Sequence, residues 1–336
     1  MLIREDYQKV FLKDFYKLEL KREKLTDTVH EKLYAVKTNI SGAGDKMSDV
    51  LPLGGFKRHT SEGENIDYVA PTSGDDKLVR YHTYSAGTVV SYETQQDSIK
   101  LKNLIKLLSG SWGESAQDEY EYFAALPFNE GGTTAGHWVF DGTHTGNTDA
   151  SGKLLYDDVC FLNLAGNPRY KNGVATAFYN SVAGLTLSPS TFKQMFILMT
   201  ATNRVTELGR PKPNKPDTLL TQEGADSETA WTMLNTYGPN NSKPGGALND
   251  RNAYTNKEDS WVGKINHIDW AYLDDTSNPF YLLKAKKNME LHKRQLPEVE
   301  FHRNPVNKAY LADIILRMGS WILGWEQIVR GGGTST

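Results

Sequence analysis

The stretch GRPKPNKPDTLLTQEG, residues 209–224, constrains the fold of this chain more than any other part of its sequence. Pro211, Pro213 and Pro216 fix φ and remove backbone donors, so the first half is predicted to be a stiff, extended connector. The second half is typical of a short buried strand that ends in a turn. We therefore expect a rigid lead-in to the central strand of a sheet.

Helices are predicted on both sides of this stretch. In TLSPSTFKQMFILMTATN, Ser188 is placed to cap the first helix and Pro189 to occupy its first position. The second helix, SETAWTMLNTYG, covers 227–238, with Ser227 as N-cap and Gly238 as C-cap. The buried stripe of the first helix is predicted to consist of Phe192, Met195, Phe196 and Met199.

The longest predicted helix covers residues 97–127, where apolar side chains recur at three- and four-residue steps from Leu101 to Phe123. Asp97 or Ser98 can cap its start, and Pro127 is expected to stop it. Two glycines in SGSWGES should permit a bend.

The N-terminal third is predicted to be one or two helices over 4–36, then a loop over 39–55 and a hairpin over 56–93 that turns at PTSGDD. The lysines of the first helix interleave with acids, which is typical of a solvated face rather than of nucleic-acid contact. The hairpin is very polar, and a lone two-stranded hairpin is marginal in water. It must therefore lie on its own body or on a neighbour.

The remaining segments alternate loops with strands. Residues 129–153 are predicted to form a surface loop with a short strand at HWVF, and LLYDDVCFLNLAG a strand or a short helix. Strands are expected in WVGKINHIDWAYL and PFYLLKAK, and one long strand, bent or bulged at its glycines, over 309–330. Residues 331–336 are expected to be a disordered tail. The order of elements predicts an α+β fold.

The sequence offers little support for catalysis. It has no dinucleotide fingerprint, phosphate loop, HExxH, GxSxG or EF-hand loop. His137, Asp141 and His144 could bind a metal, but they lie in a glycine-rich loop without a rigid support. The paired carboxylates, at 75–76, 157–158 and 274–275, are adjacent in sequence and so tend to point apart, and Cys160 has apolar neighbours typical of a buried, inert thiol. We expect no enzyme activity, no cofactor and no metal.

Net charge, cysteine content and hydropathy narrow the possible classes of protein further. The net charge of −3 does not mark a nucleic-acid binder, and the single cysteine excludes an intrachain disulfide and fits a reducing compartment. The first residues lack the apolar core of a signal peptide, and no apolar run has membrane-spanning length. We expect a soluble protein.

The ordered phrases from LTLSPSTFKQMF through GRPKPNKPDTLLTQEG, SETAWTMLNTYG, PGGALNDRN and NPFYLL to WILGWEQIVRGGG resemble the major capsid proteins of tailed phages. The match is in phrase detail over roughly 185–330 and in layout elsewhere. It implies the HK-type capsid fold, which encapsulins share. It also implies an N-terminal arm (1–36), an extended loop (37–93), a peripheral domain (94–159 and 287–330) with a spine helix (97–127), and an axial domain (160–286).

The resemblance also implies a function. Pentamers and hexamers of the chain would form the icosahedral head shell around double-stranded DNA, in the virion and, during assembly, in the host bacterial cytoplasm. A portal would be a partner, as could scaffolding and decoration proteins. An encapsulin-like compartment is the nearest alternative, and a metal-dependent enzyme using His137, Asp141 and His144 is the remote one. Some relatives crosslink a loop lysine to an asparagine, for which Lys57 or Lys77 with Asn304 or Asn307 are the candidates, but no buried carboxylate is evident for that chemistry.

Overall fold

The computed structural model describes residues 28–38, 40–42, 44–50, 73–91, 101–129, 131, 161–165, 178–204, 212–235, 264–273, 278–307, 309–322 and 324–332. The chain divides into two compact units. Unit 1 consists of Met1–Gly44, Arg80–Ala125 and Met289–Trp321, and unit 2 of Asp45–Val79, Leu126–Asn288 and Ile322–Thr336. Helices and sheets of mixed direction confirm the predicted α+β class.

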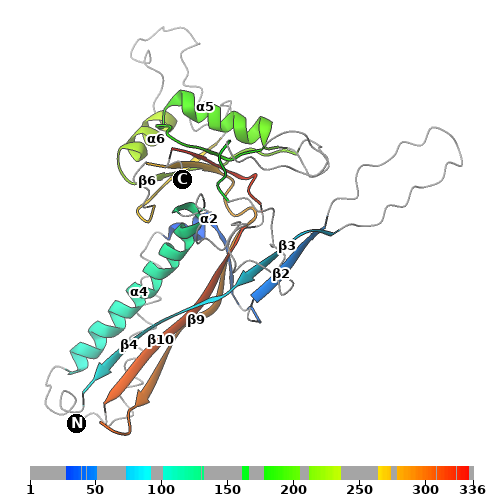
Figure 1. Ribbon diagram of the computed structural model, residues 1–336. Coiled ribbons are helices and arrows are strands. Elements are labelled where there is room, and N and C mark those ends of the chain that lie inside the picture. Colours follow the sequence, from blue (N-terminus) through cyan, green and yellow to red (C-terminus); the bar gives the residue numbers. More distant parts are fainter. Residues whose placement is uncertain are drawn as a thin grey trace, which may run out of the picture. The chain divides into compact units, whose positions relative to one another are not determined.

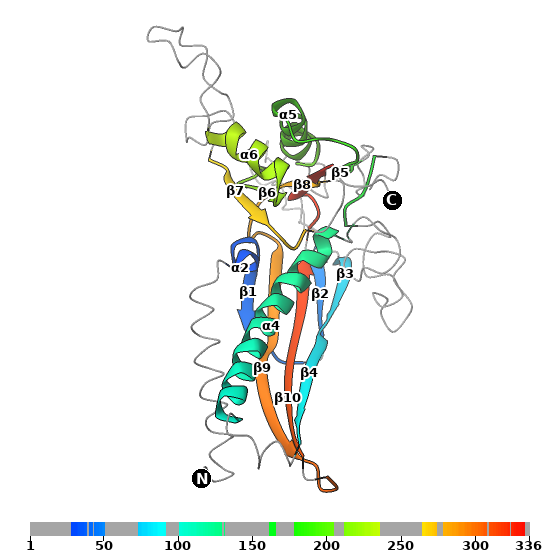
Figure 2. The ribbon, with the colours of Figure 1, turned by 90° about the vertical axis from the view of Figure 1, so that its left-hand side faces the viewer.

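Unit 1 is built on a sheet with the strand order β1-β9-β10-β4. The strands are β1 (Ala35–Thr38), β9 (Met289–Arg303), β10 (Tyr310–Ile322) and β4 (His82–Val90). β1 runs parallel to β9, whereas β4 runs antiparallel to β10. The long helix α4 (Leu101–Asn129) lies along one face of this sheet (Figure 2).

Alternation along β10 explains how α4 and the sheet form a core. Every second side chain of that strand is buried, as expected for a sheet covered on one face. From α4, Tyr120 and Phe123 are buried, and the Phe123 ring meets the ring of Tyr84 on β4 edge-on at 5.9 Å. The buried residues of β10 include Ala312, Ile314, Leu316 and Met318.

Unit 2 contains a five-stranded sheet with the order β5-β11-β8-β6-β7. The strands are β5 (Ser181–Val182), β11 (Ile328–Gly331), β8 (Phe280–Leu283), β6 (Thr218–Gln222) and β7 (Asn266–Trp270). The helices α5 (Pro189–Ile197) and α6 (Ala225–Asn235) share one apolar core with this sheet. Its members include Phe192, Met195, Phe196, Leu219, Met233, Phe280, Leu282 and Val329.

The helix before the proline connector, α5, and the strand after it, β6, are as predicted (Figure 1). Ser188 caps α5 in a capping box with Thr191, Pro189 is its first residue, and the predicted stripe is buried. The helix then continues as a π-helix over Leu198–Thr202. β6 is the predicted buried strand, and it lies between β8 and β7 in the sheet.

Several predicted boundaries are wrong. Pro127 lies inside α4, because the helix runs on to Asn129. Ser227 does not cap α6, which begins at Ala225 after Gly224, whose φ of 132° suits only glycine. In the described part of 4–36, the helix α2 is only Val29–Leu33, and Ala35 and Val36 belong to β1. Residues 161–165 form a bend and an isolated bridge rather than a strand or helix.

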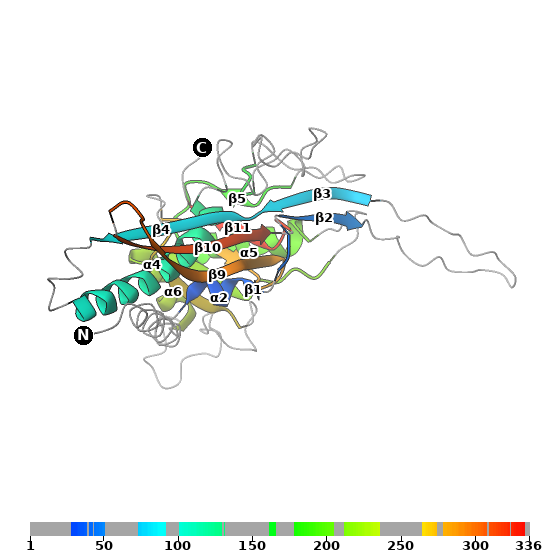
Figure 3. The same cartoon turned by 90° about the horizontal axis from the view of Figure 1, so that it is seen from below.

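The predicted hairpin also needs correction. Residues 44–50, expected to be loop, form β2 (Gly44–Val50), which pairs with β3 (Ser73–Arg80) in a separate two-stranded sheet (Figure 3). Residues 73–76, expected to be the turn, are therefore strand. The return arm divides at Tyr81, since residues 82–90 are β4 and pair with β10 of the same chain. The segment 56–70 lies outside the described residues.

The predicted C-terminal strand is two strands in two sheets. β10 ends at Ile322 in the sheet of unit 1, and β11 pairs with β5 and β8 in unit 2. The break falls near Gly324, where an added Cβ would lie 2.9 Å from the side-chain nitrogen of Asn288. The glycine thus marks a change of sheet rather than a bulge in one strand.

Gly331 on β11 gives a sharp stability prediction. A Cβ there would lie 2.2 Å from Cζ of the buried Phe280 ring, which cannot move freely in the core. Gly331→Ala is therefore expected to lower the free energy of unfolding by about 1 to 3 kcal/mol, measured by denaturant titration. Gly87→Ala on β4 is the matched control, because the one atom closer than 3.4 Å to its Cβ would be the carboxylate Oδ1 of Asp313, which can move aside. Equal stability of the two variants would contradict this packing.

Candidate functional site: a polar ribbon, its anchors and a buried charged cluster

The two-stranded sheet β2–β3, here called the ribbon, is the first candidate for contact with other molecules. Within the described residues, its strands pair with each other and with no other strand. Its sequences, GDKMSDV and SGDDKLVR, lack the apolar alternation that would give it a buried face. A two-stranded sheet of this kind is marginal in water and exposes unpaired backbone groups at its edges. It is suited to pack against another surface.

The entry to the ribbon is held by one arginine of β9. Arg294 donates from Nε to the carbonyl of Gly42 at 2.8 Å and from Nη1 to the carbonyl of Ile40. Gly42 has a φ of 100°, a conformation that only glycine adopts without strain. Two charge-assisted bonds from a planar guanidinium fix both position and direction, so residues 40–42 leave β1 along a defined path.

The exit from the ribbon is held by a series of side-chain contacts that ends at Lys37 on β1. Tyr81, which follows β3 directly, contacts Nδ1 of His292 through its hydroxyl at 3.2 Å. His292 Nε2 lies 3.1 Å from Glu290 Oε2, and Lys37 Nζ lies 2.7 Å from the same oxygen. Glu290, His292 and Arg294 are alternate residues of β9, so they share one face of the strand. One strand thus anchors both ends of the ribbon.

The contacts that Lys37 and His292 make with Glu290 have a measurable consequence, a lowered pKa of the Glu290 carboxyl group. Burial opposes its charged form, but the hydrogen bonds from Lys37 and His292 outweigh burial and lower the pKa below its ordinary value of 4.5. Because the folded-state pKa is lowered, the stabilisation is present above about pH 4.5 and is lost as pH falls through the folded value.

Glu290→Gln is therefore expected to lower the free energy of unfolding by about 1 kcal/mol at pH 7. The difference from the wild type should shrink as the pH falls below about 4.5. Thermal unfolding of both proteins between pH 7 and pH 3 tests this. A difference that is constant over that range would contradict a charged Glu290.

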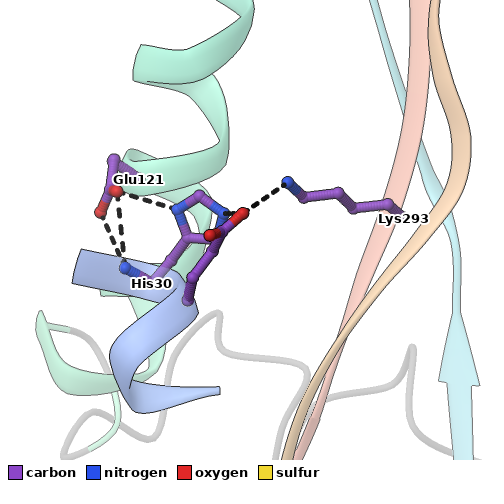
Figure 4. Close-up of polar contacts among 4 residues, drawn as sticks. His30, Glu121 and Lys293 are labelled. Atoms are coloured by element: carbon purple, nitrogen blue, oxygen red, sulfur yellow. Dashed lines mark hydrogen bonds and ion pairs between the residues drawn. The ribbon is translucent and has the colours of Figure 1, made fainter. Parts of the chain in front are cut away.

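A second polar site joins α2 to the rest of unit 1. We call His30, Glu31, Glu121 and Lys293 the α2 cluster (Figure 4). His30 is fully buried, and its Nδ1 lies 2.8 Å from Oε1 of Glu121, whose side chain is 10% exposed. The backbone N–H of His30 also points to both carboxylate oxygens of Glu121, at 3.3 and 3.4 Å.

The opposite charge in the α2 cluster comes from β9. Lys293 Nζ lies 3.9 Å from Oε1 of Glu31 and 4.3 Å from the centre of the Tyr120 ring. Lysine is rarely buried without such partners, and here a carboxylate and an aromatic face supply them. The cluster therefore holds α2 against α4 and β9 by charge and not only by apolar contact.

Tyr34 completes the attachment of α2. The side chain is fully buried, and its hydroxyl donates to the carbonyl of Ala124 near the end of α4 at 2.8 Å. Burial raises the pKa of the Tyr34 phenol far above its ordinary value of 10.0, so the phenol stays neutral and keeps its donor. Residues that precede β1 are thereby fixed to α4.

Exposed apolar side chains are few among the described residues. Val89 and Leu296 belong to unit 1, at 63% and 57% exposed, and Trp231 on α6 is 59% exposed. Single exposed apolar residues are normal on protein surfaces, but an exposed tryptophan is often a contact residue. Trp231 is the candidate contact of unit 2.

Most of the residues that the sequence offered as metal ligands or reactive groups lie outside the described part of the chain. His137, Asp141, His144, Lys57 and Cys160 lie outside the described residues, as do the carboxylate pairs at 157–158 and 274–275. Asp75 and Asp76 are consecutive residues of β3. Among the described residues, no group of three His, Cys, Asp or Glu side chains could hold a metal ion.

The crosslink candidates remain a prediction. Lys77 lies on β3, and Asn304 and Asn307 lie in the turn between β9 and β10. Both asparagines use Oδ1 to accept a backbone N–H, from Val306 at 2.9 Å and from Ala309 at 3.1 Å. Their side chains therefore stabilise the turn locally.

In the part of the chain that the structure describes, no helix combines the length and the apolar character needed to cross a membrane.

Comparisons with known proteins give a structural likeness only. No protein-family model matches the sequence, and no curated protein matches it. The capsid structure of the cyanophage P-SCSP1u is similar, with a TM-score of 0.50 and 10% identity over 92% of this chain and 89% of the other. The capsid of the cyanophage Pam1 has 14% identity and a TM-score of 0.49 over 90% and 89% of the two chains. That of the Myoviridae phage XM1 has 10% identity and a TM-score of 0.49 over 91% and 92%.

The fold follows from the first of these structures. The likeness extends over nearly all of both chains, so the whole layout is shared and not one domain. The chain has the α+β fold of tailed-phage capsid proteins, the HK-type capsid fold, as the sequence predicted. At 10% identity the likeness establishes the fold alone.

Proposed function

We propose that this chain is a major capsid protein, whose copies assemble as pentamers and hexamers into the icosahedral head of a tailed phage. The observation that carries the proposal is a capsid fold combined with a two-stranded ribbon whose sequence is polar and lacks apolar alternation. In a shell, a neighbouring copy would supply the surface that the ribbon lacks. The role is structural, with no enzyme activity, cofactor or metal.

The domain roles follow the same reasoning. Unit 1 would be the peripheral domain, with α4 as its spine helix, and the five-stranded sheet of unit 2 would belong to the axial domain. The ribbon would be the core of the extended loop that overlaps the adjacent subunit. The α2 cluster would fix the end of the N-terminal arm.

Partners and location are inferred with the function. A portal would interrupt the lattice at one vertex, and double-stranded DNA would fill the shell. Scaffolding and decoration proteins could act on it during or after assembly. The protein would be found in the virion and, before that, in the host bacterial cytoplasm.

Sedimentation velocity and negative-stain microscopy of the full-length protein test the proposal. We expect capsomers or closed shells of uniform diameter, formed alone or with a co-expressed scaffolding chain. A protein that remains monomeric at high concentration under both conditions would contradict the proposal.

An encapsulin-like compartment of the same fold is the second candidate. Terminase and portal genes beside this one would support a phage head, and a cargo-enzyme gene would support a compartment. Metal analysis of the purified protein addresses the enzyme alternative, since His137, Asp141 and His144 would have to retain about one ion per chain.

A further inference from the structure

Lysines collect at one end of the five-stranded sheet of unit 2. Leu283 at the end of β8 is opposite Thr218 on β6 and Ile328 on β11, and Thr218 is opposite Asn266 on β7. The starts of β6, β7 and β11 and the end of β8 therefore meet at the same end. The chain segments next to these strand ends carry six lysines, here called the lysine end: Lys212, Lys215, Lys264, Lys284, Lys286 and Lys287.

Hydrogen bonds hold these segments together. The side chain of Asn214 donates to the carbonyl of Glu326, and the backbone N–H of Lys284 donates to the carbonyl of Gln327 at 3.0 Å. These two bonds attach the proline connector and the turn after β8 to Glu326 and Gln327, which directly precede β11. The connector that stood out in the sequence therefore presents its lysines beside those of the turn.

The charges of the lysine end are largely uncompensated by the described part of the chain. Four of the six lysines are exposed, and none of the six has a carboxylate within 4.0 Å among the described residues. Among the described residues, the acids at this end are Asp217 and Glu326. Asp217 Oδ1 already accepts the backbone N–H of Ala285 at 2.8 Å and the hydroxyl of Thr218 at 2.9 Å.

Three of these lysines, Lys212, Lys284 and Lys287, lie close enough to repel one another. Partial burial, together with the positive charges of Lys284 and Lys212, lowers the pKa of Lys287 below its ordinary value of 10.5. Repulsion among these lysines favours a partner of opposite charge.

We infer that the lysine end binds the phosphate backbone of double-stranded DNA without sequence specificity. This inference rests on the proposed capsid function, which supplies DNA as the partner. Lysine ammonium groups suit such contact, because phosphate contacts carry no sequence information and release counterions. A chain with a net charge of −3 needs a local positive surface for this contact, and the lysine end is such a surface.

The test uses fluorescence anisotropy of a labelled 30-base-pair DNA with the full-length, unassembled chain. K286Q/K287Q is compared with K193Q/R303Q, which removes the same charge from exposed positions on α5 and β9. For the first variant we expect the salt dependence of log K to become shallower by about 1 to 2 units, with a several-fold loss of affinity at low salt. The control should resemble the wild type.

Equal effects of the two variants, or no DNA binding by the wild type, would overturn the inference. So would tight binding of a polyglutamate peptide at this end without binding of DNA, which would assign the surface to an acidic protein. Shell formation is scored separately by microscopy. Shell formation without DNA binding would contradict this inference alone. Lysine-dependent DNA binding by a chain that never forms shells would contradict the proposed function but would still support the lysine end as a DNA-binding surface.

Discussion

Replacing residues 45–79 by about eight glycine and serine residues is expected to leave a folded subunit that forms no closed shells. Both anchors of the ribbon lie outside this segment. Arg294 holds residues 40–42, and His292 contacts Tyr81. The sheet of unit 1 keeps β4, which pairs with β10. Only the surface that would contact a neighbouring copy is removed.

The matched control shortens residues 132–153, which the sequence predicts to be a surface loop. Circular dichroism should show similar thermal unfolding for both variants, and microscopy should show shells only for the control. Closed shells from the variant without the ribbon would refute its role in assembly. Loss of folding in that variant would instead mean that the ribbon is part of the subunit core.

Glu121→Ala is expected to lower the free energy of unfolding by about 3 to 5 kcal/mol. The substitution leaves the buried ring and backbone N–H of His30 without their acceptor. A buried polar group that loses its partner costs far more than the bond contributed. Denaturant titration of the unassembled chain measures the change.

Glu31→Ala is the control from the same cluster. Glu31 is 43% exposed and lies 3.9 Å from Lys293, so its loss should cost about 1 kcal/mol or less. If the two substitutions lowered the free energy of unfolding by similar amounts, burial of Glu121 would not explain how much the α2 cluster stabilises the subunit.

Much of unit 2 was predictable because its signals are local. The capping residues Ser188 and Pro189 and the apolar stripe of α5 act within one helix, and the prolines before β6 restrict the backbone by themselves. α4 was found for the same reason, since apolar side chains recur along it at helical spacing. Pro127 misled the prediction of its end, because packing around Phe128 keeps the helix going.

β9 was missed because its stability comes from other segments. It carries His292 and Lys293 as buried residues, and charged residues give no strand signal until their partners are known. Those partners, Tyr81 and Glu31, lie far away in sequence. The change of sheet between β10 and β11 was hidden for a similar reason, since both segments are apolar and only their pairing separates them.

The central claim is that the ribbon becomes part of a shell by lying on a sister copy. Cryo-electron microscopy of assembled particles tests it most directly. The account predicts an icosahedral lattice of pentamers and hexamers in which β2 and β3 of each copy contact the adjacent subunit. Particles in which the ribbon folds back onto its own subunit, or a protein that remains single under all assembly conditions, would contradict it.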